Sequence, residues 1–209
     1  MIRVCHIVNL ITGRADGVYT HLKMIFKNYD RIKFEHYLIF QGEETIENEV
    51  GEMGTKVFVS TSLKKKISVK AFVDIHRFLK NNNIDIIQVH LIKPYAIAGL
   101  VNIILRKKFI FNYHGIFLRN NPYYNFIGKS IYSAIHYLIF VFGKVDAVLV
   151  PSNRSKELLS SETKLFPEPV VYYNGYSICH EIPEVNAQHL KLIGEIIQSQ
   201  AEPGFYVRC

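Results

Sequence analysis

The sequence lacks tryptophan altogether and has only three cysteines among its 209 residues, Cys5, Cys179 and Cys209. Cysteines so few and so widely spaced exclude a disulfide framework and a Cys-x-x-Cys metal site, and they fit a reducing cytoplasm. No spacing of ligand residues calls for a metal, so we expect neither a metal nor a tightly bound cofactor. The sequence also has no internal repeat and no low-complexity segment, which excludes a solenoid.

A run long enough to cross a membrane is missing as well. The most apolar stretch, residues 131–150, is interrupted by His136, Lys144 and Asp146. Its charge-free part, residues 131–143, has 13 residues, whereas about 20 are needed to span the hydrocarbon of a bilayer. The first residues do not have the pattern of a signal peptide. We therefore expect a cytoplasmic protein.

What the sequence has in excess is positive charge. Lysine and arginine number 25 against 18 aspartates and glutamates, which gives a net charge of +7 and a pI of about 9.2. Such an excess favours an anionic partner, whether nucleic acid, acidic lipid or a phosphorylated substrate. Because the basic residues are dispersed and no nucleic-acid-binding motif occurs, we expect no nucleic-acid partner.

Short apolar runs alternate along the chain with segments of helical periodicity. Strands are predicted over residues 2–11, 34–40, 56–60, 84–91, 108–114, 145–152 and 169–175. Helices are predicted over residues 18–29, 68–83, 94–105, 124–142 and 153–162, with a short one inside 42–54. This alternation predicts an α/β fold with a doubly wound, mostly parallel, Rossmann-like sheet. Ligands of such sheets bind at the carboxyl ends of the strands.

The segment LITGRADGVYTHLKMIF, residues 10–26, joins the first strand to the first helix through Gly13 and Gly17. Asp16 is placed to cap the free N–H groups of the helix. Those groups and the positive end of the helix dipole then point at one spot, which suits an anion such as phosphate. The alternative is an ordinary strand-to-helix turn in which the glycines supply positive φ, because a full G-x-G-x-x-G pattern is missing.

Three segments with polar residues follow later strands, at the positions that line the site of a Rossmann-like fold: VHLIKPYA, NYHGIFLRN and YYNGYS. They contain His90, His114 and Arg119, and then Asn174 with Gly175. Each has a purely structural alternative. A histidine at a strand end can bond to its own loop, a loop arginine can be solvated, and an Asn-Gly pair suits a turn.

The order of these motifs resembles the N-terminal domain of family 4 glycosyltransferases, the retaining GT-B enzymes that build cell-surface polysaccharides and glycolipids. Residues 2–178 carry the resemblance, through HIVNLITGRADGVYTHL, DIIQVHLIKPYAIAGL, FNYHGIF, VDAVLVPSNRSKELL and VVYYNGYS. It implies the N-terminal half of a GT-B fold. Residues 1–178 would form the Rossmann-like acceptor-side domain, and residues 179–209 a linker and the truncated start of a missing C-terminal donor domain.

The resemblance also implies roles for individual residues. Gly17, with Gly13 near it, matches the glycine turn that approaches the diphosphate of the donor. His114 matches the histidine that faces the reacting sugar or acceptor, and is the expected catalytic residue. The aspartate usual two places after the closing Asn-Gly pair is Ser177 here, which departs from the family pattern. The residues expected to line the acceptor side or the cleft are His90, Arg119, Asn174 and Gly175.

The implied activity is retaining transfer of a hexose from a nucleoside diphosphate sugar, the co-substrate, to a saccharide or lipid-linked acceptor. The sequence lacks the acidic motif of the family's C-terminal half and the basic residues that neutralise the leaving diphosphate. Half a cleft neither stabilises that charge nor excludes water, so we expect the chain alone to be inactive. A separate C-terminal half is then a further expected partner. The alternative is a non-catalytic binding module or the acceptor-binding subunit of a split glycosyltransferase.

The resemblance further implies peripheral binding to the inner face of a membrane, because acceptors in this family are often lipid-linked. The predicted helix over residues 124–142 combines aromatic and aliphatic residues with flanking basic ones, which suits an anionic lipid surface. The alternative is that the helix packs on the sheet. We expect this for the helix as a whole, with its tyrosine-rich start and Lys129 left to contact lipid.

Overall fold

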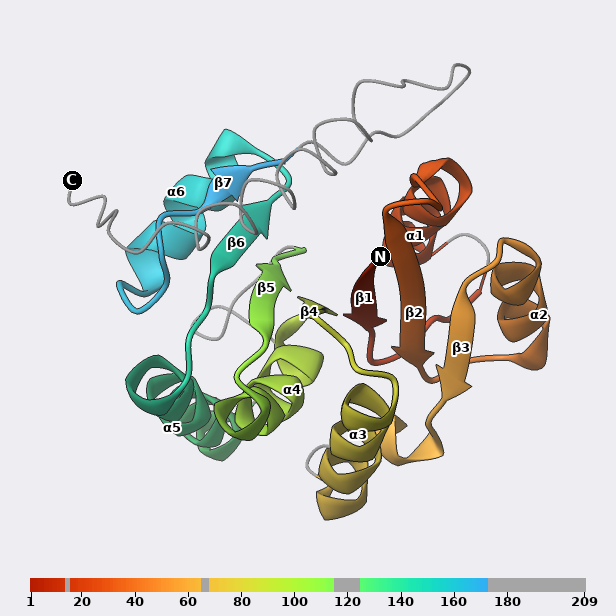
Figure 1. Ribbon diagram of the computed structural model, residues 1–209. Helices are drawn as coiled ribbons and strands as arrows, with labels where there is room; N and C mark the ends of the chain where they lie inside the picture. The colour runs from red at the N-terminus through yellow and green to blue at the C-terminus, as the bar shows by residue number, and fades with distance from the viewer. Residues whose placement is uncertain (14–15, 65–67, 115–124, 173–209) are drawn as a thin grey trace.

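The computed structural model describes residues 1–13, 16–64, 68–114 and 125–172. Its strands form one seven-stranded sheet in the order β3-β2-β1-β4-β5-β6-β7, and every neighbouring pair is parallel (Figure 1). The strands are β1 (Ile2–Ile7), β2 (Phe34–Phe40), β3 (Lys56–Val59), β4 (Ile86–His90), β5 (Lys108–Asn112), β6 (Ala147–Val150) and β7 (Val170–Val171). The predicted parallel sheet is confirmed.

Helices connect the strands, and most begin at a polar residue that caps the first turn. The helices are α1 (Gly17–Asn28), α2 (Glu44–Glu52), α3 (Val69–Asn81), α4 (Ile92–Leu105), α5 (Phe126–Phe142) and α6 (Asn153–Glu162), with a short 3-10 turn, η1 (Thr61–Lys64). The capping side chains, each accepting a backbone N–H of the following turn, are those of Asp16, Ser68, Asn125 and Ser152. These caps satisfy donors that have no partner within the helix.

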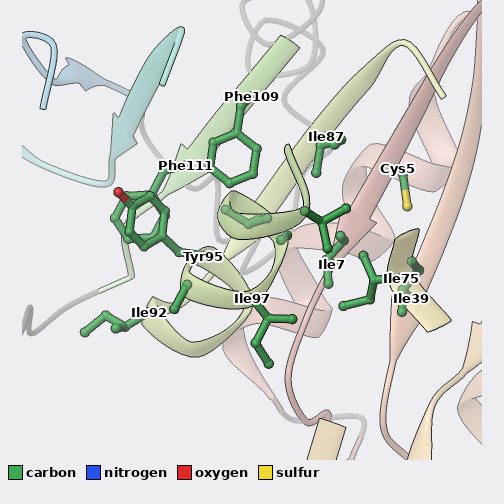
Figure 2. Close-up of a cluster of buried hydrophobic side chains, with 14 of the residues drawn as sticks. Cys5, Ile7, Ile39, Ile75, Ile87, Ile92, Tyr95, Ile97, Phe109 and Phe111 are labelled. Carbon is green, nitrogen blue, oxygen red and sulfur yellow. The ribbon is translucent and has the colours of Figure 1, made fainter. Parts of the chain in front are cut away.

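Helices cover both faces of the sheet, because side chains of a strand point alternately to either side. Cys5 and Ile7 of β1 belong to a core cluster with residues of α3, α4, α5 and α6. In this cluster the ring of Tyr95 from α4 lies against Phe111 of β5, with 4.6 Å between centroids (Figure 2). Val8, on the opposite face, packs with residues of α1 and α2. The fold is therefore doubly wound, as predicted.

Helix α5 does not pack on the sheet as a whole, so that expectation is wrong. It buries only Tyr132, His136 and Ile139. Eight large apolar residues of α5 are 40–84% exposed: Phe126, Ile127, Ile131, Tyr137, Leu138, Phe140, Val141 and Phe142. The physical reason is its place in the helix layer, where it contacts α4 on one side (Figure 1). Within the described residues, no helix has the length and apolar content to cross a bilayer.

Candidate functional site

The candidate site lies at the carboxyl edge of β1, β4 and β5. The connections from β1 run outward to β2 and β3, whereas those from β4 run the other way to β5, β6 and β7. The strand order thus reverses between β1 and β4, and ligands of doubly wound sheets bind at such a reversal. Helix α1 starts beyond β1, His90 is the last residue of β4, and His114 follows β5 by two residues.

The turn into α1 is organised by Asp16. Its carboxylate accepts backbone N–H bonds from Val18 at 2.9 Å and Tyr19 at 3.2 Å, and the Thr12 hydroxyl donates to it at 3.3 Å. Gly13 has a φ of +152°, which side-chain-bearing residues rarely adopt. The predicted cap is therefore present. A negative side chain already occupies two of the N–H groups that an incoming phosphate would use.

His114 lies beside this turn. Burial lowers the pKa of His114 to about 4, and the charge of Asp16 opposes the shift only in part. The imidazole is neutral at physiological pH. The ring of His21, in α1, lies 5.8 Å from that of His114 and 5.5 Å from that of Tyr172, which follows β7. The start of α1 and His114, expected to meet at one place, are thus brought together.

His90 supports His114 from inside the molecule. It is completely buried, and its Nδ1 lies 3.0 Å from Nε2 of His114. The side-chain amide nitrogen of Asn112 lies 3.5 Å from the same Nδ1. The residue after His90, Leu91, has φ 73° and ψ 163°, a strained conformation that turns the chain from β4 into α4. Helix α4 consequently begins two residues before Pro94, which sits in its first turn where proline is tolerated.

The remaining expected site residues, Arg119, Asn174 and Gly175, lie outside the described residues. Their roles stay predictions, as do those of Gly13 and Gly17 at the donor diphosphate. Among the residues that the structure describes, no group of three or more histidine, cysteine, aspartate or glutamate side chains is placed to hold a metal ion.

Three buried histidines near the site, His6, His21 and His36, were not among the expected site residues. His6 and His36 interrupt the apolar strands β1 and β2 at positions that point to the same side as Val4, Val8 and Leu38. A polar residue at an alternate position of a buried strand is the only sequence signal they give. Strand order and register are needed to bring them together.

Residues 15–178 match the model of Glycosyltransferase Family 4, which is most of the chain. The chain belongs to glycosyltransferase family 4. No curated protein is similar enough in sequence to count as a match.

Solved structures share the fold of this family 4 domain at low sequence identity. A glycosyltransferase from Rickettsia africae aligns with a TM-score of 0.64 and 18% identity, over 92% of this chain and 49% of that one. HepE from Anabaena, solved with UDP and glucose, aligns with a TM-score of 0.63 and 15% identity, over 94% of this chain and 51% of HepE. The lipopolysaccharide outer core galactosyltransferase WaaB, in its apo form, aligns with a TM-score of 0.56 and 15% identity, over 87% of this chain and 48% of WaaB. The chain thus spans about half the length of these proteins and matches half of a GT-B structure.

Proposed function

We propose that this domain is the acceptor side of a retaining glycosyltransferase. It acts in the transfer of a hexose from a nucleoside diphosphate sugar to a saccharide or lipid-linked acceptor during surface-polysaccharide or glycolipid synthesis. The observation that carries the proposal is the meeting of His114 with the start of α1 at the strand-order reversal of a family 4 chain. The structures of HepE with UDP and with UDP-glucose support a sugar nucleotide as partner.

The chemistry follows from the charges at the site. Glycosyl transfer separates an anionic diphosphate from an oxocarbenium-like sugar, so groups that stabilise the developing charge lower the barrier. The N–H groups of Gly13 and Gly17, at the positive end of α1, would face the diphosphate. His114, neutral at physiological pH, would accept or donate a hydrogen bond at the reacting sugar or the acceptor hydroxyl. A complementary C-terminal half would supply the remaining cationic groups.

Diphosphate binding can be tested through Asp16. Asp16→Asn keeps an oxygen for the N–H groups of Val18 and Tyr19 but removes the negative charge next to the expected phosphate. We expect UDP to bind the variant about two- to fivefold more tightly, since a charge at a helix N-terminus contributes about 0.3–1 kcal/mol. The measurement is a titration followed by amide NMR shifts, with uridine as the ligand that lacks phosphate.

Two results would count against the anion site. One is an affinity for UDP that is equal in the Asp16→Asn variant and the parent. The other is a set of shifts at Gly13 and Gly17 that uridine reproduces fully.

The activity can be tested with a panel of sugar nucleotides and lipid acceptors, measuring release of nucleoside diphosphate. We expect negligible turnover by the chain alone, turnover when a complementary half is supplied, and loss of at least a hundredfold on His114→Ala. Ile32→Ser, at an exposed loop position outside the site, is the matched control. Turnover that survives His114→Ala would exclude His114 from the chemistry. A persistent lack of turnover with a complementary half, together with retained UDP binding, would favour the binding-module alternative.

A second part of the proposal is peripheral binding to an anionic membrane, and the exposed face of α5 favours it. This helix exposes apolar side chains from Phe126 to Phe142 and contains Lys129 but no acidic residue. Ile103 of α4 lies next to Gly143, which follows α5, so the carboxyl ends of the two helices are close together. Basic residues follow both ends: Arg106 and Lys107 after α4, and Lys144, which pairs with Asp146, after α5. Apolar side chains flanked by positive charge suit insertion between acidic headgroups.

Sedimentation with vesicles tests this location. We expect the chain to bind phosphatidylglycerol vesicles more strongly than phosphatidylcholine vesicles, and the double variant Phe140→Ser/Phe142→Ser to lose most of that binding. Ile32→Ser removes an exposed apolar residue outside α5 and should bind like the parent. Equal binding by the double variant, or none by the parent, would remove the membrane proposal.

A further inference from the structure

Four histidines from neighbouring segments form one row on the side of the sheet that α1 covers. In order they are His36 of β2, His6 of β1, His90 of β4 and His114 after β5. The sheet register explains the row, because each histidine lies two residues beyond the residue that pairs with the previous one. A step of two residues keeps side chains on the same face. The pairs that set the row are His36 with Val4, His6 with Gln88, and His90 with Asn112.

The four rings contact one another head to tail. Nδ1 of His36 lies 2.8 Å from Nε2 of His6, Nδ1 of His6 lies 3.4 Å from Nε2 of His90, and Nδ1 of His90 lies 3.0 Å from Nε2 of His114. A neutral imidazole has one N–H donor and one acceptor nitrogen. The three links between the rings therefore allow only two fully hydrogen-bonded states, one with the proton on every Nδ1 and one with the proton on every Nε2. The side-chain nitrogen of Asn112, 3.5 Å from Nδ1 of His90, finds an acceptor there only in the second state. Any mixture places two N–H groups, or two lone pairs, against each other.

We propose that His36, His6 and His90 are positioning residues, and that the row they form with His114 fixes which nitrogen of His114 carries the proton. In the first state Nδ1 of His114 is a donor, and in the second it is an acceptor. Passing from the first to the second moves one proton across each of the three links. It also removes a proton from Nδ1 of His114 and adds one to Nε2 of His36, so the total charge is unchanged. The consequence for catalysis rests on the proposed function, whereas the row does not.

The surroundings of the row favour strong coupling between its members. His6, His36 and His90 are completely buried. Phe26 packs edge-on against His6 at 5.3 Å, and Tyr29 against His36 at 4.4 Å. A charged imidazole held in such surroundings without a counter-ion would be costly, so neutral rings are favoured. Hydrogen bonds shielded from water are stronger and polarise one another, so a change at one end is felt at the other.

The test is to read the tautomers of all four rings by NMR of the chain labelled with ¹⁵N-histidine at neutral pH. Protonated and unprotonated ring nitrogens have well-separated shifts. We expect all four histidines of the parent to share one tautomer. In His36→Phe we expect the ring nitrogens of His114 to shift, although three links separate the two residues. In His36→Asn, whose amide is bonded to Cγ as Nδ1 is in histidine, we expect the His114 shifts to return toward those of the parent.

Phe26→Leu is the matched control, since it alters packing at the same end of the row without removing a ring nitrogen. Mixed tautomers in the parent would overturn the proposal, and so would His114 shifts that do not change in His36→Phe or change equally in Phe26→Leu. If His36→Phe does not fold, the proposal is still tested by the tautomers of the parent and by comparing the His114 shifts of His36→Asn with those of Phe26→Leu. The experiment needs no substrate, so a failure of the glycosyltransferase assays leaves its outcome unaffected.

Discussion

Helices α4 and α5 are both rich in apolar residues, yet α4 is almost entirely buried and α5 exposes most of its large side chains. α4 lies between α3 and α5 over the centre of the sheet, so it is covered on several sides (Figure 1). α5 has a helix neighbour on one side, and it therefore buries one stripe. Apolar content thus predicts that a helix has a partner surface, but the order of the strands decides how much of the helix the fold covers.

The contact between the two helices depends on one polar pair and one close approach. The hydroxyl of Tyr95, in α4, lies 2.7 Å from Nδ1 of His136, in α5, and Nε2 of His136 lies 3.2 Å from the hydroxyl of Thr163. Gly99 of α4 faces Ile139 of α5 at a distance that leaves no room for a methyl group. Substitutions at these residues test the packing of α5 against α4 without altering the exposed face of α5.

The largest expected effect is the acid sensitivity of the α4–α5 contact. Burial lowers the pKa of His136 to about 4, from an unfolded value of about 6.5. Below pH 6.5 the unfolded chain binds a proton at this residue that the folded chain does not. The stability that the neutral form supplies is therefore complete above pH 6.5 and is lost as the pH falls toward 4, by about 3 kcal/mol in total.

Denaturant unfolding at a series of pH values checks this. His136→Gln cannot titrate, so its free energy of unfolding should fall less steeply than that of the parent between pH 7 and pH 4. Tyr95→Phe removes the hydrogen bond but keeps the histidine, and should follow the slope of the parent. His114, whose pKa is lowered in the same direction, remains in both variants and cancels in the comparison. Parallel curves for the parent and His136→Gln would contradict the prediction.

The next effect is a contrast between two helical glycines. A Cβ at Gly99 would lie 3.0 Å from Cγ1 of Ile139, and closer still to its Cδ1, whereas a Cβ at Gly51 in α2 would meet nothing within 4 Å. Overpacking a core costs about 1–3 kcal/mol, and replacing a helical glycine by alanine gains about 1 kcal/mol. We expect Gly51→Ala to raise the melting temperature and Gly99→Ala to lower it. A rise in both would mean that α5 moves aside at no cost.

Much of the fold can be predicted from the sequence because local patterns suffice for it. Strand β2 has the predicted bounds, residues 34–40, and α6 the predicted bounds 153–162. The cap at Asp16 follows from its position before a helical apolar pattern. The parallel sheet follows from strands buried on both faces, which alternate with helices. The site at the carboxyl edge, with His114 beside the start of α1, then follows from topology.

The rest depends on contacts that sequence patterns do not contain. The strand predicted over residues 2–11 ends at Ile7, although Val8 and Ile11 stay buried against α1 and α2. The exposure of α5 depends on what lies beside it. The row of four histidines needs both the strand order and the register, since neighbouring members are up to 84 residues apart along the chain.

The smallest expected effect lies at the start of α4, where Leu91 adopts φ 73° and ψ 163°. Only glycine is comfortable in this region, and other residues held there cost about 1–3 kcal/mol. Leu91→Ala and Leu91→Gly both remove the leucine side chain, but only the glycine relieves the strain. We therefore expect the glycine variant to be more stable than the alanine variant by about 1 kcal/mol in denaturant unfolding. In a helix or strand, a glycine variant is normally less stable than the alanine variant by about 0.5–1 kcal/mol. A more stable glycine variant would therefore identify backbone strain at Leu91. If the alanine variant is instead the more stable one, the turn after His90 is not strained. The position of α4 would then depend on the burial of its side chains alone.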